Sequence, residues 1–174
     1  KNAWLPKLAD GSAIGTFALT EKPGQNAVAR VEATVTGGKL SGTKLPVADG
    51  EIANVAVVAA QEGGALSLYL VDLSSDGVTR TALDSFDMSR SQARIDFDGA
   101  ACEKLEGADA DGIATLLDVA AVLQAFEQVG AAERAPEITR AFILGRDAFG
   151  KRIAAFHAIQ HRMADLLREI ALAR

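Results

Sequence analysis

The chain has 174 residues, of which 49% are hydrophobic and 24% charged, and its formal net charge is −5 at pH 7. This composition is typical of a globular protein and excludes a disordered tail. The acidic balance argues against a nucleic-acid partner, because phosphate binding requires a basic face. Arginines gather late in the chain, but on a helix they would be spread around its surface, which favours a solvated face over a polyanion groove.

The apolar runs and the cysteine content predict the environment of the protein. No run approaches the roughly 18 uninterrupted apolar residues that a membrane span requires, so we expect no membrane contact. Cys102 is the single cysteine, which excludes an intramolecular disulfide and a paired-cysteine metal cluster. A reducing, cytoplasmic compartment is therefore expected.

Both ends of the chain look cut. It begins with Lys1 rather than Met, and the residues from Glu169 to Arg174 keep helical periodicity without a Gly or Pro stop signal. We expect the chain to be a piece of a longer protein.

Residues 12 to 100 alternate short apolar runs with turn signals, which is typical of an antiparallel sheet. The expected strands are Ile14–Leu19, Ala29–Thr36, Lys39–Ser41, Val55–Ala60, Leu66–Leu73, Val78–Leu83 and Gln92–Phe97. Alternation is clearest in three sets, which are Val31, Ala33 and Val35, then Leu66, Leu68 and Leu70, then Ala93, Ile95 and Phe97. We predict an antiparallel β-barrel or sandwich over residues 1–107.

After Gly107 the apolar residues recur every three or four positions, which predicts helices over residues 108–174. The first helix is capped by Asp109 or Asp111 and runs to about Leu144, with Pro136 as a candidate kink. The second begins near Lys151, after a Phe149-Gly150 turn. The predicted class is thus α+β, a sheet followed by a long α-helical hairpin. A hairpin cannot bury both faces of both helices, so it is expected to be half of a four-helix bundle that the parent chain or another subunit completes.

Chemical motifs are sparse when the residues are considered alone. His157, His161 and Asp165 are spaced four apart on one helical face, a spacing that suits a metal ion, but no fourth ligand is evident and packing or polar contacts are favoured. Glu127 and Asp118 are candidate acid–base groups, for which ordinary surface carboxylates are again the favoured interpretation. We predict no metal site and no catalytic residue.

Five segments, in order and spacing, resemble those of acyl-CoA dehydrogenases. They are Trp4–Gly11, Phe17–Glu21, Gly42–Lys44, Gly145–Gly150 and Phe156–His161. The chain resembles the middle β-domain of that family followed by the first two helices of the C-terminal helical domain. The resemblance implies an FAD-dependent oxidoreductase in which a carboxylate removes the α-proton of an acyl-CoA thioester while the flavin takes the β-hydride.

The resemblance also implies two sets of cofactor-binding residues. Phe17, Leu19 and Thr20 would lie along the flavin edge, where fixed hydrogen-bond donors favour hydride acceptance. Arg146, Phe149 and His157 would contact the adenine-dinucleotide part of an FAD bound mainly by a neighbouring subunit. Acyl-CoA is the implied substrate, and a homo- or hetero-oligomer, either a dimer or a tetramer, is expected to form through the helical domain.

Several residues depart from the family pattern. The catalytic base lies in a later segment in most members, and the position that a minority use corresponds to Ala120, so no base is expected in this chain. Leu45–Ala48 replaces a Trp-Ile-Thr or Trp-Ile-Ser stretch that packs on the flavin, the loop 22–26 lacks the usual Gly-Ser-Asp, and His157 stands where glutamine is common. Three hypotheses remain. The chain is a fragment of an active flavoenzyme, a non-catalytic partner subunit of a heteromeric dehydrogenase with a degenerate flavin site, or an unrelated binding module with a β-barrel and a helical hairpin.

Overall fold

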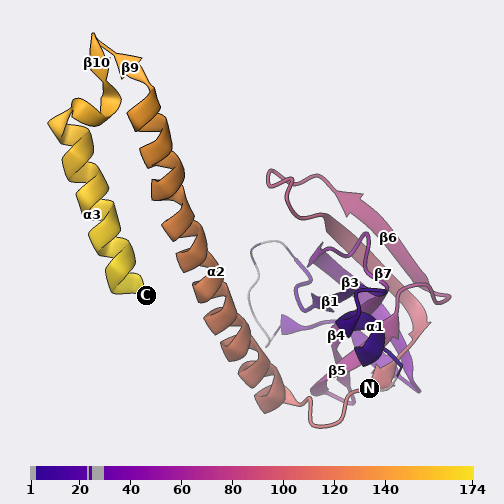
Figure 1. Ribbon diagram of the computed structural model, residues 1–174. Coiled ribbons are helices and arrows are strands. Elements are labelled where there is room, and N and C mark those ends of the chain that lie inside the picture. The colour runs from indigo at the N-terminus through magenta and orange to yellow at the C-terminus, as the bar shows by residue number, and fades with distance from the viewer. Residues whose placement is uncertain (1–2, 23, 25–29) are drawn as a thin grey trace. The chain divides into compact units, whose positions relative to one another are not determined.

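The computed structural model describes residues 3–22, 24 and 30–174 of the chain. The polypeptide forms two units, Lys1–Thr115 and Leu116–Arg174. The first contains a short helix α1 (Leu5–Ala9), the β-sheet and the beginning of helix α2, and the second is a helical hairpin (Figure 1). The first turn of α2 belongs to the first unit, which ends at Thr115. The domain boundary predicted between residues 107 and 108 stays a prediction.

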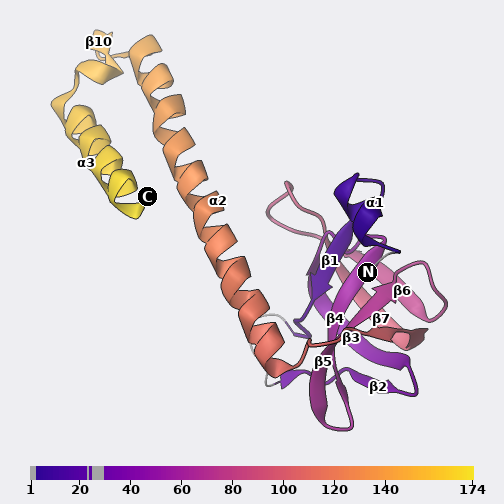
Figure 2. The ribbon, with the colours of Figure 1, turned by 60° about the horizontal axis from the view of Figure 1, so that its bottom comes forward.

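A mixed sheet of eight strands makes up most of the first unit. Its order is β6-β7-β3-β2-β4-β5-β8, and β1 pairs with β4 outside this path. The strands are β1 (Gly15–Ala18), β2 (Thr34–Thr36), β3 (Lys39–Ala48), β4 (Val55–Glu62), β5 (Ala65–Asp72), β6 (Val78–Leu83), β7 (Gln92–Ala101) and β8 (Glu103–Lys104). Figure 2 shows the strands curving around a shared interior.

The sheet is sandwich-like and open, because its two end strands, β6 and β8, do not pair with each other. The prediction of a sandwich is therefore confirmed, and that of a closed barrel is wrong. Two pairings are also parallel rather than antiparallel: β1 runs along β4 with Phe17 opposite Val57, and β2 meets β4 at Thr34 and Gln61. An alternating pattern indicates which side of a strand is buried but carries no information on the direction of its neighbour.

The core lies between the layers of the sheet and is built from aliphatic side chains such as Leu40, Val58 and Ile95, all with 0% exposure. Two of the alternating sets are buried as predicted, namely Val31, Ala33, Val35 and Ala93, Ile95, Phe97. In β5 the prediction holds only for Leu68, which is buried, while Leu66 and Leu70 are half-buried. Ser67, Tyr69 and Val71, on the opposite face, are buried as well. Both polar groups find partners, since the Ser67 hydroxyl donates to the Ala108 carbonyl at 2.9 Å and the Tyr69 hydroxyl to Glu62 at 3.2 Å.

The buried position of Tyr69 has a measurable consequence. Burial, followed by the hydrogen bond to Glu62, raises the pKa of Tyr69 from 10.0 to about 12. Tyr69 is the single tyrosine of these 174 residues, and the tyrosinate absorbance that Tyr69→Phe removes reports it alone. We expect a titration midpoint of about 12 in the native protein, moving back toward 10.0 in denaturant. The neutral form favours folding, so this stability is full below pH 10.0 and is lost as the pH rises through about 12. A native midpoint at the unfolded value would contradict the prediction.

Helix α2 spans Ala110–Gly145 and begins at the predicted cap. Asp109 Oδ1 accepts the Gly112 N–H at 3.0 Å, while Asp111 lies in the first turn. Ile113, with 0% exposure, anchors that first turn in the core of the first unit. Pro136 lies inside the helix without ending it, since the helix continues to Gly145.

The hairpin closes through a short β-turn, and here the prediction of a helix from Lys151 is wrong. Phe149 and Gly150 have φ of 54° and 77° and turn the chain back on itself. Strand β10 (Lys151–Arg152) therefore pairs with β9 (Asp147–Ala148), and a 3₁₀ turn, η2 (Ile153–Ala155), follows. Helix α3 begins only at His157 and ends at Ala173.

Much of the apolar surface of α2 is exposed. Its most apolar 18-residue window has a mean hydropathy of 1.3 and is 6% buried, so by length and composition alone the helix could cross a membrane. Such a helix is equally expected where further helices pack against it, as in the four-helix bundle predicted from the sequence. The expectation of no membrane contact stays a prediction.

Candidate functional site

The predicted flavin-edge residues lie together in the first unit. Phe17 belongs to β1, Leu19 and Thr20 follow it directly, and all three are half-buried. The Leu19 carbonyl accepts a hydrogen bond from Lys44 Nζ at 3.1 Å, and the Thr20 carbonyl accepts the Leu45 N–H at 2.9 Å. The segment is thus fixed to β4 on one side and to β3 on the other.

A buried ion pair, absent from the sequence prediction, fixes the end of this segment. Lys44 Nζ lies 2.7 Å from Glu21 Oε1, and the two side chains are 0% and 7% exposed. Glu21 also accepts the N–H groups of Glu32 at 2.7 Å and Ala33 at 2.9 Å. Burial raises the pKa of Glu21, but the hydrogen bonds from Lys44, Ala33 and Glu32 outweigh burial and leave that pKa below 4.5.

Each residue of the Gly42-Thr43-Lys44 motif has a structural role in this region. Gly42 has a φ of 145°, and a Cβ there would lie 2.7 Å from Ala33 Cβ. The Thr43 hydroxyl donates to Asp96 at 2.6 Å, and Lys44 forms the ion pair with Glu21. The motif therefore brings β3 close to residues 32–33 and leaves the lysine inside. Alternation from Leu40 through Gly42 to Lys44 is the sequence signal that places this lysine on the inward face.

The neighbouring stretch Leu45–Ala48 lacks the side chains that would pack on the face of a flavin ring. Pro46 and Ala48 are exposed, Val47 is buried, and none of them offers an aromatic ring or a hydroxyl. The Ala48 carbonyl is already occupied by the Thr16 hydroxyl at 2.6 Å. Of the altered loop 22–26, Pro23, Gln25 and Asn26 lie outside the described residues. The first unit therefore offers the Phe17–Thr20 edge but lacks the partner that the resemblance implies for the ring face.

The predicted dinucleotide-binding residues lie together in the second unit, at the end where β9 and β10 join the helices. Arg146 follows α2, Phe149 sits at the β-turn and His157 begins α3. The Ile153 N–H donates to the Arg146 carbonyl at 3.0 Å, and Arg152 Nη1 donates to the Gly145 carbonyl at 2.6 Å. The three side chains thus belong to one compact segment, and all are exposed.

Arg146 has the chemistry of an anion-binding group. Its guanidinium lies 5.9 Å from the centre of the Phe142 ring, and within the described ranges no carboxylate is within ion-pair distance of it. A shallow hollow of about 460 Å³ beside it is lined by Ala141, Phe142, Gly145, Arg146 and Asp147. A planar guanidinium matches phosphate oxygens in charge and in geometry, so this end of the hairpin fits a phosphate group.

Phe149 presents an apolar ring at the same end. It is 96% exposed and meets Phe156 edge to face, with the ring centres 6.3 Å apart. Lys151 Nζ lies 4.3 Å from the Phe156 ring centre. An exposed aromatic ring beside cations can stack on an aromatic ligand such as a purine base.

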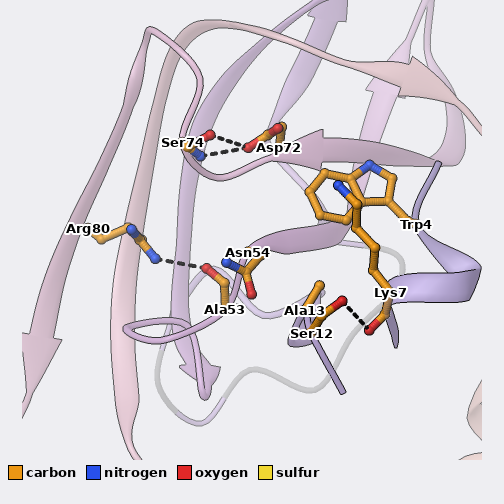
Figure 3. A pocket seen from close by; sticks show the side chains of 9 residues that line it. All are labelled: Trp4, Lys7, Ser12, Ala13, Ala53, Asn54, Asp72, Ser74 and Arg80. Carbon is orange, nitrogen blue, oxygen red and sulfur yellow. Dashed lines mark hydrogen bonds between the residues drawn. The ribbon is translucent and has the colours of Figure 1, made fainter. Parts of the chain in front are cut away.

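A separate hollow of about 190 Å³ lies in the first unit (Figure 3). It is lined by Trp4, Lys7, Ser12, Ala13, Ala53, Asn54, Asp72, Ser74 and Arg80. Its charged groups already have partners, since Arg80 donates to the Ala53 carbonyl at 2.9 Å and Asp72 accepts two hydrogen bonds from Ser74. None of the predicted site residues lines it, and the Trp4–Gly11 segment contributes Trp4 and Lys7 to its wall.

The other candidates gain no support. Among the residues with described positions, no group of three or more His, Cys, Asp or Glu side chains could hold a metal ion, so His157, His161 and Asp165 form no such cluster. Asp118, Ala120 and Glu127 are exposed on α2. The absence of a catalytic base and of a metal therefore stays a prediction.

Comparisons with known proteins match both units. The family described as "Acyl-CoA dehydrogenase, C-terminal domain" matches residues 111–174. Acyl-CoA dehydrogenase IpdE2 of Mycolicibacterium smegmatis is 37% identical over 107 residues, which are 59% of this chain and 33% of that protein. Acyl-CoA dehydrogenase FadE27 of Mycobacterium tuberculosis is 28% identical over 95% of this chain and 44% of its own length.

A solved structure agrees with this result. The crystal structure of glutaryl-CoA dehydrogenase from Mycobacterium smegmatis superposes with a TM-score of 0.87 and 30% identity, covering 99% of this chain and 47% of that one. The chain thus spans about a third to a half of the proteins that it matches. The family match on α2 and α3, the related sequences and the shared fold of both units agree, and the chain is similar to acyl-CoA dehydrogenases over both units.

Proposed function

We propose that the chain is part of a flavin-dependent enzyme that oxidises an acyl-CoA thioester between its α and β carbons. The exposed Arg146, next to Phe149 at the turn between the hairpin helices, is the observation that carries the proposal. It is suited to the phosphates of a dinucleotide, and the neighbouring ring to its base. The bound flavin would accept the hydride, while the Thr20 hydroxyl and the backbone around it would hold the ring edge.

A related structure supports the choice of cofactor. A glutaryl-CoA dehydrogenase from Mycobacterium smegmatis, 28% identical and with a TM-score of 0.83, was crystallised in complex with FADH2. Breakdown of fatty acids or other acyl-CoA compounds is the corresponding metabolic role. A cytoplasmic location is part of the proposal, supported by the single cysteine, and fractionation of cells that produce the tagged protein tests it.

Replacing Arg146 with methionine is expected to weaken flavin binding. Loss of a charge-assisted contact to phosphate costs about 1.5–3 kcal/mol, so the affinity should fall by roughly tenfold to a hundredfold. The visible absorbance and fluorescence of added FAD measure this in the full-length protein that contains the chain. Arg162→Met is the matched control, because Arg162 is an exposed arginine of α3 outside the predicted set. Equal affinities for the two variants would contradict the role of Arg146, and absence of any flavin binding by the full-length protein would contradict the proposed function.

A second candidate function is that of a non-catalytic partner subunit in a heteromeric dehydrogenase. Pro46 and Ala48 favour it, because they leave the flavin ring without an aromatic or a hydroxyl contact from β3. Among similar structures is the ChsE4-ChsE5 complex from Mycobacterium tuberculosis, 26% identical with a TM-score of 0.80. In such an assembly Arg146 and Phe149 would serve a flavin held mainly by the other subunit.

The two candidates differ in what the purified protein does alone. A partner subunit is expected to bind flavin and oxidise acyl-CoA only after mixing with a second subunit of the family. Reduction of a dye acceptor by the full-length protein and an acyl-CoA, in the absence of any second subunit, would exclude this candidate.

A further inference from the structure

Lys44 is a fully buried charged side chain in the middle of β3. Its ammonium group makes two hydrogen bonds, to Glu21 Oε1 at 2.7 Å and to the Leu19 carbonyl at 3.1 Å. The first bond compensates the buried charge. The second connects this charge to the backbone of the segment that the resemblance places at the flavin edge.

The second bond matters because of the chemistry of the peptide group. The carbonyl of Leu19 and the N–H of Thr20 belong to one planar, conjugated unit. A cation on the carbonyl oxygen draws electrons from the nitrogen, so the N–H becomes a stronger hydrogen-bond donor, and chains of hydrogen bonds polarise one another in this way at low local dielectric. Lys44 therefore acts on a backbone donor that its own side chain does not contact.

Stability alone does not account for a lysine at this position. A well-packed hydrophobic pair of similar volume is commonly as stable as a buried ion pair, or more stable. A neighbouring ion pair, between Lys22 Nζ and Glu32 Oε1 at 2.8 Å, is formed in solvent, since the two side chains are 54% and 67% exposed. Lys44 is distinguished from it by burial and by the bond to Leu19.

We propose that Lys44 is a positioning residue that fixes the Leu19–Thr20 peptide group and strengthens its N–H as a donor toward the reduced flavin. The inference rests on the proposed function, since it assigns this peptide to the flavin edge. Negative charge develops at the N1 and C2-carbonyl edge of the flavin on reduction, and a stronger donor there stabilises the reduced state.

The test compares three variants of the full-length protein. Lys44→Met removes the cation and leaves the Glu21 carboxylate without its counter-ion. Glu21→Gln with Lys44→Met removes both charges, and the single glutamine oxygen keeps one of the two backbone N–H bonds, from Glu32 or from Ala33. Lys22→Met removes the exposed lysine as a control. For each we measure unfolding in urea, hydrogen exchange of peptides covering residues 17–21, and the midpoint potential of added flavin.

The double variant decides between positioning and simple stabilisation. It should recover most of the stability lost in Lys44→Met, because no unpaired buried charge remains. Exchange in segment 17–21 should nevertheless stay faster by about tenfold. The midpoint potential of the bound flavin should stay more negative than in the wild type. The shift should correspond to a roughly three- to tenfold loss in the binding of reduced flavin relative to oxidised flavin. Lys22→Met should match the wild type in all three.

Recovery of exchange protection and potential together with stability in the double variant would overturn the proposal, because Lys44 would then be structural only. If the wild-type protein binds no flavin, the proposed function fails, and the exchange measurement alone decides whether Lys44 positions the segment. Unchanged exchange in the double variant would then overturn that part as well.

Discussion

Glu21→Ala is expected to lower the free energy of unfolding by about 3–5 kcal/mol, as for other buried ion pairs that lose one partner. The substitution leaves the ammonium of Lys44, which is 0% exposed, without its carboxylate. It also removes the acceptor for the N–H groups of Glu32 and Ala33. Urea unfolding followed by circular dichroism measures the change.

The matched control is Glu32→Ala, which breaks the exposed pair with Lys22. Exposed pairs contribute about 0–1 kcal/mol, so this variant should unfold close to the wild type. The two variants should also differ in pH dependence. The pKa of Glu21 lies below 4.5 in the folded protein, so its contribution is present above that pH and is lost as the pH falls through the lowered value. Glu21→Ala should lack this part of the acid sensitivity, and equal stability of the two variants at neutral pH would contradict the importance of the pair.

Gly42→Ala is expected to destabilise the first unit by about 2–4 kcal/mol, from a positive φ combined with overpacking. The new Cβ would lie 2.7 Å from Ala33 Cβ and 2.8 Å from Ala33 Cα, at a φ of 145°. Ala33 donates its N–H to Glu21, so a shift of this residue would also disturb the buried ion pair. Thermal and urea unfolding measure the loss.

Gly63→Ala separates the two contributions. Gly63 also has a positive φ, of 59°, but a Cβ there would meet nothing within 4 Å. Its substitution should cost about 1–2 kcal/mol from backbone conformation alone. If Gly42→Ala cost no more than Gly63→Ala, the close approach of β3 to Ala33 would not be the reason for the glycine in the Gly-Thr-Lys motif.

The sequence predicts the strands best where alternation and turn residues agree. Val78–Leu83 is found with the predicted bounds, and Val55–Ala60 is found two residues longer, as Val55–Glu62. The prediction for β3 stops at Ser41 because Gly42 and Pro46 are ordinarily strand breakers, whereas the structure extends the strand to Ala48. Here the glycine is required by a close backbone contact that only the folded chain reveals.

The candidate site was predictable to a different degree in each unit. Arg146, Phe149 and His157 are close in sequence, so a local turn is enough to bring them together. The Phe17–Thr20 segment is held by Lys44, which is distant in sequence and lies in the part of β3 that the sequence did not predict as a strand. Alternation places Lys44 inward, but its pairing with Glu21 depends on tertiary contacts that no local pattern encodes.

Phe149 illustrates how a sequence can keep a residue that its own backbone disfavours. A two-residue turn with positive φ at both positions is best served by Asn-Gly, and a phenylalanine at a φ of 54° is among the poorer choices. The turn itself does not require a phenylalanine, and the ring is 96% exposed apart from its edge-to-face contact with Phe156. The strained backbone at position 149 therefore holds an aromatic ring in solvent, which is the placement that the proposed stacking of Phe149 on a base requires.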